Sequence, residues 1–175
     1  MATCTVQTGE TLDCKISGGA RKVYVADFAN VGTPTVTSGV IATWTAAANK
    51  FFVYNVRPET AEAKAEVQQN DANGTAYFMH TVNMVTYILT SPKNQEFQRL
   101  AANRVVIIVE DRNSTTVGGA GKYWVYGFNN GLVLTGGGGG TGKAMADKNG
   151  YDYTFTGGQE NMPIEYTGSI SSLLA

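Results

Sequence analysis

The stretch EAKAEVQQNDANGTAYFMHTVNMVTYILT, residues 62–90, indicates the fold class, because it contains two strand-like segments on either side of a turn. In residues 62–69, Ala63, Ala65, Val67 and Gln69 alternate with four polar residues, Glu62, Lys64, Glu66 and Gln68. A period of two is typical of a half-exposed strand. A helix is the alternative, because Ala, Glu, Lys and Gln are all good helix formers. We favour the strand.

The second part of the stretch predicts a long strand that is entered from a tight turn. Asn73 and Gly74 are suited to the positive φ angles of a hairpin turn. Residues 75–90 then run without Gly or Pro and are rich in Tyr, Phe, Val, Thr and Ile. At about 3.3 Å per residue they would span roughly 50 Å. This length is typical of a strand in a barrel shared between subunits rather than of a small sandwich.

Most of the remaining sequence also predicts strands, separated by Gly, Asn, Asp and Pro. We expect residues 104–111 (RVVIIVED), the most apolar run, to form a central strand. Asn129 and Asn130 suit a type I′ turn between strands at 122–128 and 131–135. The other expected strands are residues 22–28, 35–44, 51–57 and 151–156. Alternating βα units are absent, which argues against a parallel α/β sheet.

One helix is predicted, beginning at residues 91–92. Ser91 is a suitable N-cap and Pro92 fits the first helical position. Phe97 and Leu100 lie three residues apart on one helical face, which we expect to pack against a sheet containing Val105 and Ile107. The 175 residues suit a single domain. The prediction is therefore an all-β sandwich or barrel, residues 1–175, with one short flanking α-helix.

The surface is polar but carries few charges. Charged residues make up 15% of the chain and hydrophobic residues 43%, whereas a typical soluble domain has about 25% charged residues. A subunit buried against its neighbours tolerates such a surface, although a weakly charged monomer has the same composition. The net charge of −1 argues against a free nucleic-acid binder and leaves open passive contact with DNA.

No enzymatic site emerges, and we expect no catalytic residues, cofactor or metal. The run GGGGTGK, residues 137–143, satisfies the first part of a P-loop, but Ala144 stands where a hydroxyl should bind magnesium. His80, the only histidine, has no partner for a hydrolytic triad. Cys4 and Cys14 flank a turn and are either close together or two small buried thiols. We also expect no signal peptide, no membrane-spanning segment and synthesis in a cytoplasm.

Several short motifs resemble those of one family. They are residues 122–127 (KYWVYG), 130–132 (NGL), the glycine run with 141–142 (TG), 147–151 (DKNGY) and 154–157 (TFTG), with Cys4, residues 12–14 (LDC) and 18–19 (GG) near the N-terminus. This set resembles small virion proteins of tailed phages that infect Bacteroidota, including crAss-like phages, which in turn resemble phage tail-tube proteins. The resemblance covers most of the chain.

The resemblance implies a non-catalytic structural subunit of a virion that forms a homo-oligomeric ring of the tail tube or head-to-tail connector. Six copies is the usual number, and twelve remains open. Neighbouring tail or connector proteins and double-stranded DNA in the channel are the implied partners. We expect Glu62, Lys64, Glu66 and Gln68 to face the channel, or alternatively to lie on the outer wall. A capsid decoration protein, a carbohydrate-binding β-sandwich and, less well supported, a nucleotide-using enzyme are the alternative functions.

Overall fold

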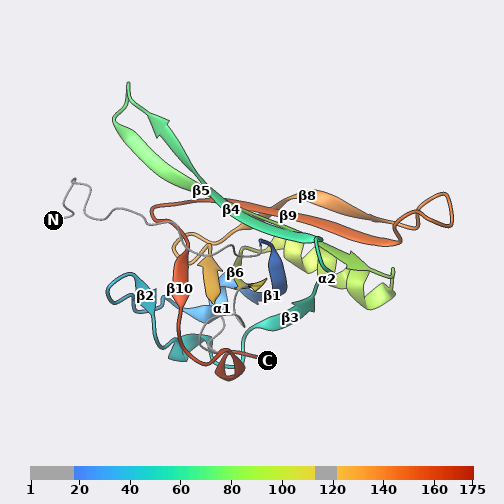
Figure 1. The fold of residues 1–175 in the computed structure, drawn as a ribbon, viewed down its shortest axis with the longest axis horizontal. Coiled ribbons are helices and arrows are strands. Elements are labelled where there is room, and N and C mark those ends of the chain that lie inside the picture. The colour runs from blue at the N-terminus through green and yellow to red at the C-terminus, as the bar shows by residue number, and fades with distance from the viewer. Residues whose placement is uncertain (1–17, 113–121) are drawn as a thin grey trace.

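The computed structural model describes residues 18–112 and 122–175, which form two β-sheets that pack against each other (Figure 1). The larger sheet has six strands in the order β2-β10-β7-β6-β1-β3. Its strands are β1 (Ala20–Asp27), β2 (Val40–Ile41), β3 (Phe52–Asn55), β6 (Val105–Asp111), β7 (Tyr123–Tyr126) and β10 (Ile164–Tyr166). The smaller sheet is antiparallel, in the order β4-β5-β9-β8. Its strands are β4 (Ala61–Asn70), β5 (Thr75–Tyr87), β8 (Val133–Gly140) and β9 (Gly150–Gln159).

The predicted all-β fold with one short flanking helix is confirmed. The flanking helix is α2 (Ser91–Ala102), and α1 (Phe28–Val31) adds a single helical turn. Short 3-10 turns η1 (Thr45–Ala47) and η3 (Ile170–Ser172) complete the described elements. Cys4 and Cys14 lie outside the described residues.

Two apolar cores hold the molecule together, one on each face of the six-stranded sheet. The core between the sheets combines Val82 of β5 and Phe155 of β9 with Val23 and Ile107 of the larger sheet. The second core combines the opposite face of the larger sheet with the chain segments that cover it, including Trp44 and Phe51. Every residue of β6 up to Glu110 is buried, and the strand lies between β7 and β1. The predicted central strand is therefore confirmed.

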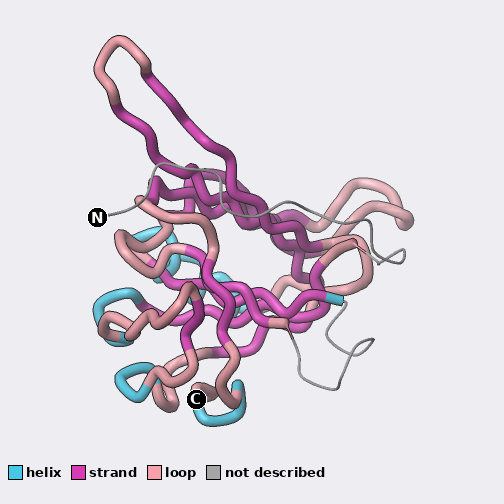
Figure 2. Tube along the Cα trace, turned by 60° about the vertical axis from the view of Figure 1, so that its left-hand side comes forward, coloured by secondary structure: helices cyan, strands magenta, loops and turns pink. Residues whose placement is uncertain are grey.

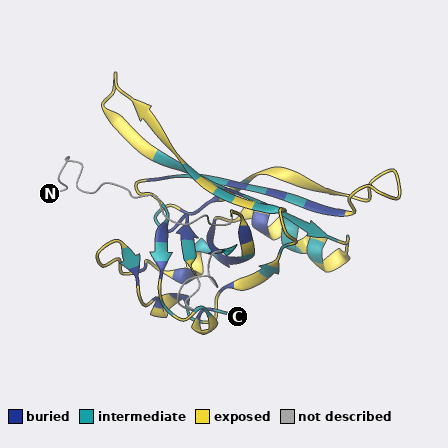
Figure 3. Ribbon diagram, viewed as in Figure 1, coloured by how far each residue is buried: buried dark blue, intermediate teal, exposed yellow. Residues whose placement is uncertain are grey.

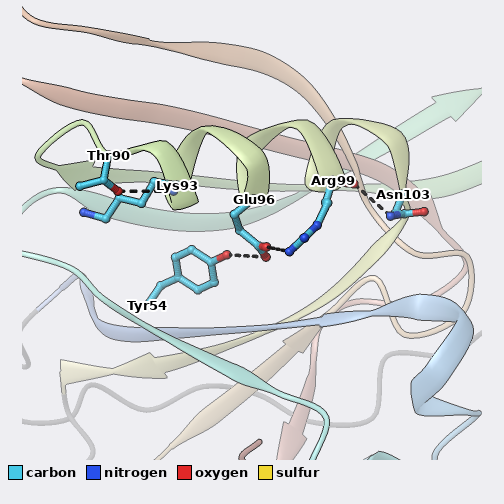
Figure 4. Close-up of polar contacts among 6 residues, drawn as sticks. All are labelled: Tyr54, Thr90, Lys93, Glu96, Arg99 and Asn103. Atoms are coloured by element: carbon cyan, nitrogen blue, oxygen red, sulfur yellow. Dashed lines mark hydrogen bonds and ion pairs between the residues drawn. The ribbon is translucent and has the colours of Figure 1, made fainter.

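Helix α2 lies beside both sheets and is capped at its start by a side chain (Figure 4). The cap is Thr90, one residue earlier than predicted, and its hydroxyl accepts a hydrogen bond from the Lys93 amide at 3.4 Å. Leu100 is buried in the core that also contains Val105 and Ile107. Phe97 is only partly buried, and its ring packs 5.1 Å from that of Tyr153. Phe97 therefore contacts β9 of the smaller sheet as well as the predicted core.

The hairpin of β4 and β5 extends beyond the rest of the smaller sheet as an arm, which we define as residues 67–77 (Figures 1 and 2). Pairing between β5 and β9 ends at Phe78 and Gln159, so the arm has only two strands. All of its residues are exposed (Figure 3). Gly74 has a positive φ of 63°, as predicted, whereas Asn73 does not, so only one of the two expected positive φ angles is present. The turn has four residues, 71–74, between the paired Asn70 and Thr75.

Three other predictions about local structure were wrong. The glycine-rich run, for which the sequence predicts no strand beyond residue 135, forms most of β8 and pairs with β9. Asn129 and Asn130 do not close a hairpin, because β7 and β8 belong to different sheets, and the positive φ angles there are those of Gly127 and Gly131. Only Val40–Ile41 of the strand expected at 35–44 is a strand. In each case the local preference of the sequence for a loop, turn or strand is outweighed by whether a distant strand is available for pairing.

Candidate assembly surface

The outer face of the four-stranded sheet, turned away from the core, is partly exposed and mostly polar. Strand alternation is clear in β4, where Ala61, Ala63 and Ala65 are half-buried and the residues between them are exposed. Residues 62–69 therefore form a strand, as predicted, and not a helix. The outer face consists of Glu62, Lys64, Glu66, Gln68, Met79, Thr81, Asn83, Val85, Val133, Thr135, Asp152, Thr154 and Thr156, as the burial pattern and strand register indicate.

The structure places the four candidate channel residues together along β4. Glu62, Lys64, Glu66 and Gln68 are all exposed and all lie on the outer face. Lys64 Nζ donates to Glu66 Oε1 at 3.0 Å. The Glu66 carboxylate raises the pKa of Lys64 above its usual value, through this hydrogen bond and through its charge. The ion pair leaves Glu62 as the uncompensated charge in this row.

The middle of the outer face carries hydroxyl and amide groups in place of charges. Across β5 and β9, Thr81 lies opposite Thr156 and Asn83 lies opposite Thr154. The Thr156 hydroxyl donates to Thr135 Oγ1 on β8 at 3.1 Å. Asp152, the one acidic residue of β9, forms an ion pair with Lys148. A polyanion that passes over this face meets few full charges of either sign.

Both edges of this sheet are open within the described ranges 18–112 and 122–175. β4 and β8 are the outermost strands, and neither has a strand partner there on its outer side. The edges are long, with ten residues in β4 and eight in β8. Unpaired N–H and C=O groups on such edges are templates for pairing with another chain.

The glycines of β8 are only partly explained by packing within the chain. A Cβ on Gly139 would lie 2.7 Å from the Tyr151 ring, and one on Gly137 would collide with the Asp152 carbonyl. Gly138 and Gly140, by contrast, would place a Cβ in open space. Glycine inside a strand often marks a place where another backbone approaches closely. The absence of side chains at Gly138 and Gly140 is therefore compatible with a strand of another chain approaching this edge.

His80 joins the smaller sheet to the larger one at the base of the arm. It is fully buried on β5, and its Nδ1 accepts the Gly127 amide at 3.3 Å. Its Nε2 lies 2.9 Å from the Asn161 carbonyl oxygen, to which it donates. Burial lowers the pKa of His80 below its ordinary value. Because the side chain is buried and each ring nitrogen has a hydrogen-bond partner, we interpret His80 as a structural histidine.

The segment that resembles a P-loop has a different geometry in the structure. The amides of Lys143 and Ala144 donate to Asp147 Oδ2 at 2.8 and 2.7 Å, and these bonds lower the pKa of Asp147. A P-loop uses such amides to bind phosphate and leads into a helix. Here a carboxylate of the chain takes both amides, and the following residues lead into β9.

Two features were not predicted from the sequence. A groove with a volume of about 620 Å³ runs between β4 and β7, and Trp124, Tyr126 and Met162 are among its lining residues. Ile88, just after β5, has a positive φ of 69° and is 66% exposed. The sequence contains no signal for either feature, because the groove joins distant segments and a β-branched residue disfavours this backbone conformation.

The described residues contain no cluster of three His, Cys, Asp or Glu side chains that could hold a metal ion. No helix in the described part of the chain is long and apolar enough to cross a bilayer. Comparisons with family models, with curated proteins and with solved structures find no match.

Proposed function

We propose that this chain is a structural subunit of a tailed bacteriophage virion, forming a homo-oligomeric ring of the tail tube or of the head-to-tail connector. The observation that carries the proposal is a four-stranded antiparallel sheet with one buried face, one mostly polar face turned away from the core, and two edges that have no strand partner in the described residues. The role is non-catalytic. Its partners are further copies of the chain, neighbouring tail or connector proteins, and DNA in the channel.

The strand directions support closure of a ring through this sheet. β4 and β8 run in opposite directions, because they are the first and last of four strands in an antiparallel order. If β8 of one copy pairs with β4 of the next, the alternation continues without a break. A head-to-tail contact of this kind can close into a ring, and a closed barrel has no free edges left.

The size of such a barrel suits a DNA channel. Six copies of a four-stranded sheet give 24 strands. With strands about 4.8 Å apart and tilted by up to about 40°, the barrel is roughly 40–50 Å wide between backbones. That width admits side chains and a DNA duplex. The barrel would enclose one face of the sheet, which in this proposal is the polar outer face.

The chemistry of the outer face suits DNA that passes without being held. Threonine and asparagine occupy its centre, and β4 contributes Glu62 and the Lys64–Glu66 ion pair. Lys and Arg residues that neutralise phosphates would bind DNA tightly. A face with few cations and a slight excess of carboxylates lowers the resistance to passing DNA. Glu62, Lys64, Glu66 and Gln68 are the proposed channel residues.

Electron microscopy of the purified protein tests the proposal directly. Rings or tubes with a central channel are the expected result, and a monomer at every concentration would contradict it. Paired cysteines test the edge contact, with one on β4 (Lys64→Cys) and one at position 136, 138 or 140 of β8, in a chain with Cys4 and Cys14 replaced by Ser. At least one pair should give a covalent ladder whose last band reports the number of copies. Each single cysteine variant is the control.

Two other roles remain as alternatives. A capsid decoration protein would use the same fold at a different place in the virion, and locating the chain in a virion map distinguishes the two. A carbohydrate-binding module has one observation in its favour, since the half-buried Trp124 lines a groove and sugars stack on accessible aromatic rings. Titration of soluble glycans, followed by tryptophan fluorescence and repeated with Trp124→Ala, tests this second role.

A further inference from the structure

Ile88 has a strained backbone conformation, and its exposed position gives little packing that would offset the strain. Its φ of 69° is a true outlier for a β-branched residue, and two thirds of the side chain is exposed. Hydrogen bonds nevertheless hold the backbone here. The Ile88 amide donates to Asn149 O at 2.9 Å, and Lys93 Nζ donates to Ile88 O at 3.2 Å. Strain of this kind persists where the surrounding structure enforces it, often at a binding surface.

The surroundings of Ile88 form a socket, which we define by Arg57, Val85, Tyr87, Ile88 and residues 146–149. Its volume is about 520 Å³. The Arg57 guanidinium lies 4.0 Å over the ring of Tyr87 and forms no ion pair with any described residue. Asp147, which lines the socket, binds backbone amides, and Asp152, which lies opposite Val85, pairs with Lys148. The socket therefore combines an exposed apolar side chain with an available cation.

The arm has the complementary chemistry. Val67 and Tyr77 are 61% and 44% exposed, and Asp71 is the only charged residue among residues 67–77. Asp71 accepts a hydrogen bond from Gln69 and forms no ion pair with a described residue. A two-stranded hairpin that is exposed on both faces is only marginally stable by itself. The arm therefore lacks packing that a contact with another molecule would supply.

The arm and the socket lie at opposite ends of one strand. The arm contains the start of β5, and Ile88 follows its last residue, Tyr87. Thirteen extended residues place them about 40 Å apart. Figure 1 shows the arm at the upper left, whereas β5 ends at the right, near the start of α2. The arm of one copy therefore cannot reach its own socket, but it can reach the socket of a second copy placed end to end.

We propose that the socket binds the arm of a second copy of this chain, with Tyr77 against Ile88 and Val85, and Asp71 facing Arg57. The contact is heterologous and repeats along the strand direction, so it stacks one ring on the next. The inference rests on the proposed ring, because stacking needs a ring to act on. It goes further by naming the residues that join successive rings, which are separate from the sheet edges that close each ring.

Ile88→Gly is the sharpest test, because folding and assembly should respond in different directions. Glycine adopts this φ freely, so the thermal unfolding midpoint should stay the same or rise. Stacking should weaken about tenfold, as for the loss of one apolar anchor, with single rings remaining in micrographs and sedimentation profiles. Ser38→Gly is the matched control, since Ser38 also has a positive φ but lies next to β2 of the other sheet.

A charge exchange tests the same contact independently. Asp71→Arg and Arg57→Asp should each shorten tubes to single rings, and the double variant should restore them, because each new cation then faces a new carboxylate on the next copy. Tubes unchanged by Ile88→Gly and by both charge variants would overturn the arm–socket contact while leaving the ring intact. Failure of the wild-type chain to form any ring would overturn the proposed function and, with it, this inference.

Discussion

His80 Nε2 lies 2.9 Å from the carbonyl oxygen of Asn161, and this contact ties the base of the arm to the chain that leaves β9. The other ring nitrogen accepts the Gly127 amide. Both bonds need the neutral ring with its proton on Nε2. A second proton on Nδ1 would oppose the Gly127 amide inside a fully buried site.

We expect the free energy of unfolding to fall as the pH drops below about 6.5, the ordinary pKa of histidine. Burial lowers the pKa of His80 in the folded protein, so as the pH falls the unfolded chain takes up the proton first. The contribution of His80 to the free energy of unfolding is fully present above the pKa that the histidine has in the unfolded chain. Below that pH the contribution is lost, by up to about 1.4 kcal/mol per pH unit. Urea unfolding at pH 8.0 and 5.5 measures the change. His80→Gln should reduce the dependence, since the chain has no other histidine.

Phe97→Ala should destabilise the fold by about 2–3 kcal/mol, below the 3–5 kcal/mol typical of a fully buried Phe. The ring is only partly buried, but it lies 6.0 Å from the Tyr151 ring and 5.1 Å from that of Tyr153. Gln98→Ala, at an exposed position of the same helix, should change stability by less than about 0.5 kcal/mol. Chemical denaturation of both variants makes the comparison. Equal effects would mean that α2 does not pack through Phe97.

Lys143→Ala should leave stability, assembly and nucleotide response unchanged, because the residue contributes only its backbone amide to the turn. Asp147→Ala removes the acceptor of two amides and should lower stability, as the loss of a capping side chain does. Thermal unfolding with and without ATP measures both effects. Micromolar ATP binding that disappears in Lys143→Ala would contradict the interpretation of this segment as a capped turn.

Glu62→Lys combined with Glu66→Lys should convert the proposed channel face into one that holds DNA. Both positions are exposed, so stability should change by less than about 0.5 kcal/mol. Assembled rings of the variant should bind duplex DNA, and the affinity should fall steeply with salt as counterion release requires. The matched control, Glu62→Gln with Glu66→Gln, removes charge without adding cations. If neither variant alters DNA binding by intact rings, Glu62 and Glu66 lie on the outside of the ring and not in its channel.

Local sequence determined the elements whose signals lie within a few residues of each other. Alternation in residues 62–69 predicted a strand with Glu62 and Lys64 on one face, and the apolar run at 104–111 predicted a central strand. Both are confirmed. Capping chemistry placed the start of α2 to within one residue. These features depend on side-chain period and on nearby backbone groups, so a short window contains the necessary information.

Only the tertiary structure determined how distant segments pair and what they leave open. A run of five glycines has no intrinsic preference for a strand, yet β9 supplies its hydrogen-bonding partner. Asn129 and Asn130 suit a tight turn, but the strands on either side belong to different sheets. The strained Ile88 and the two open edges of the smaller sheet likewise depend on residues far apart in the chain. Strand pairing is a non-local interaction, and local propensity does not specify it.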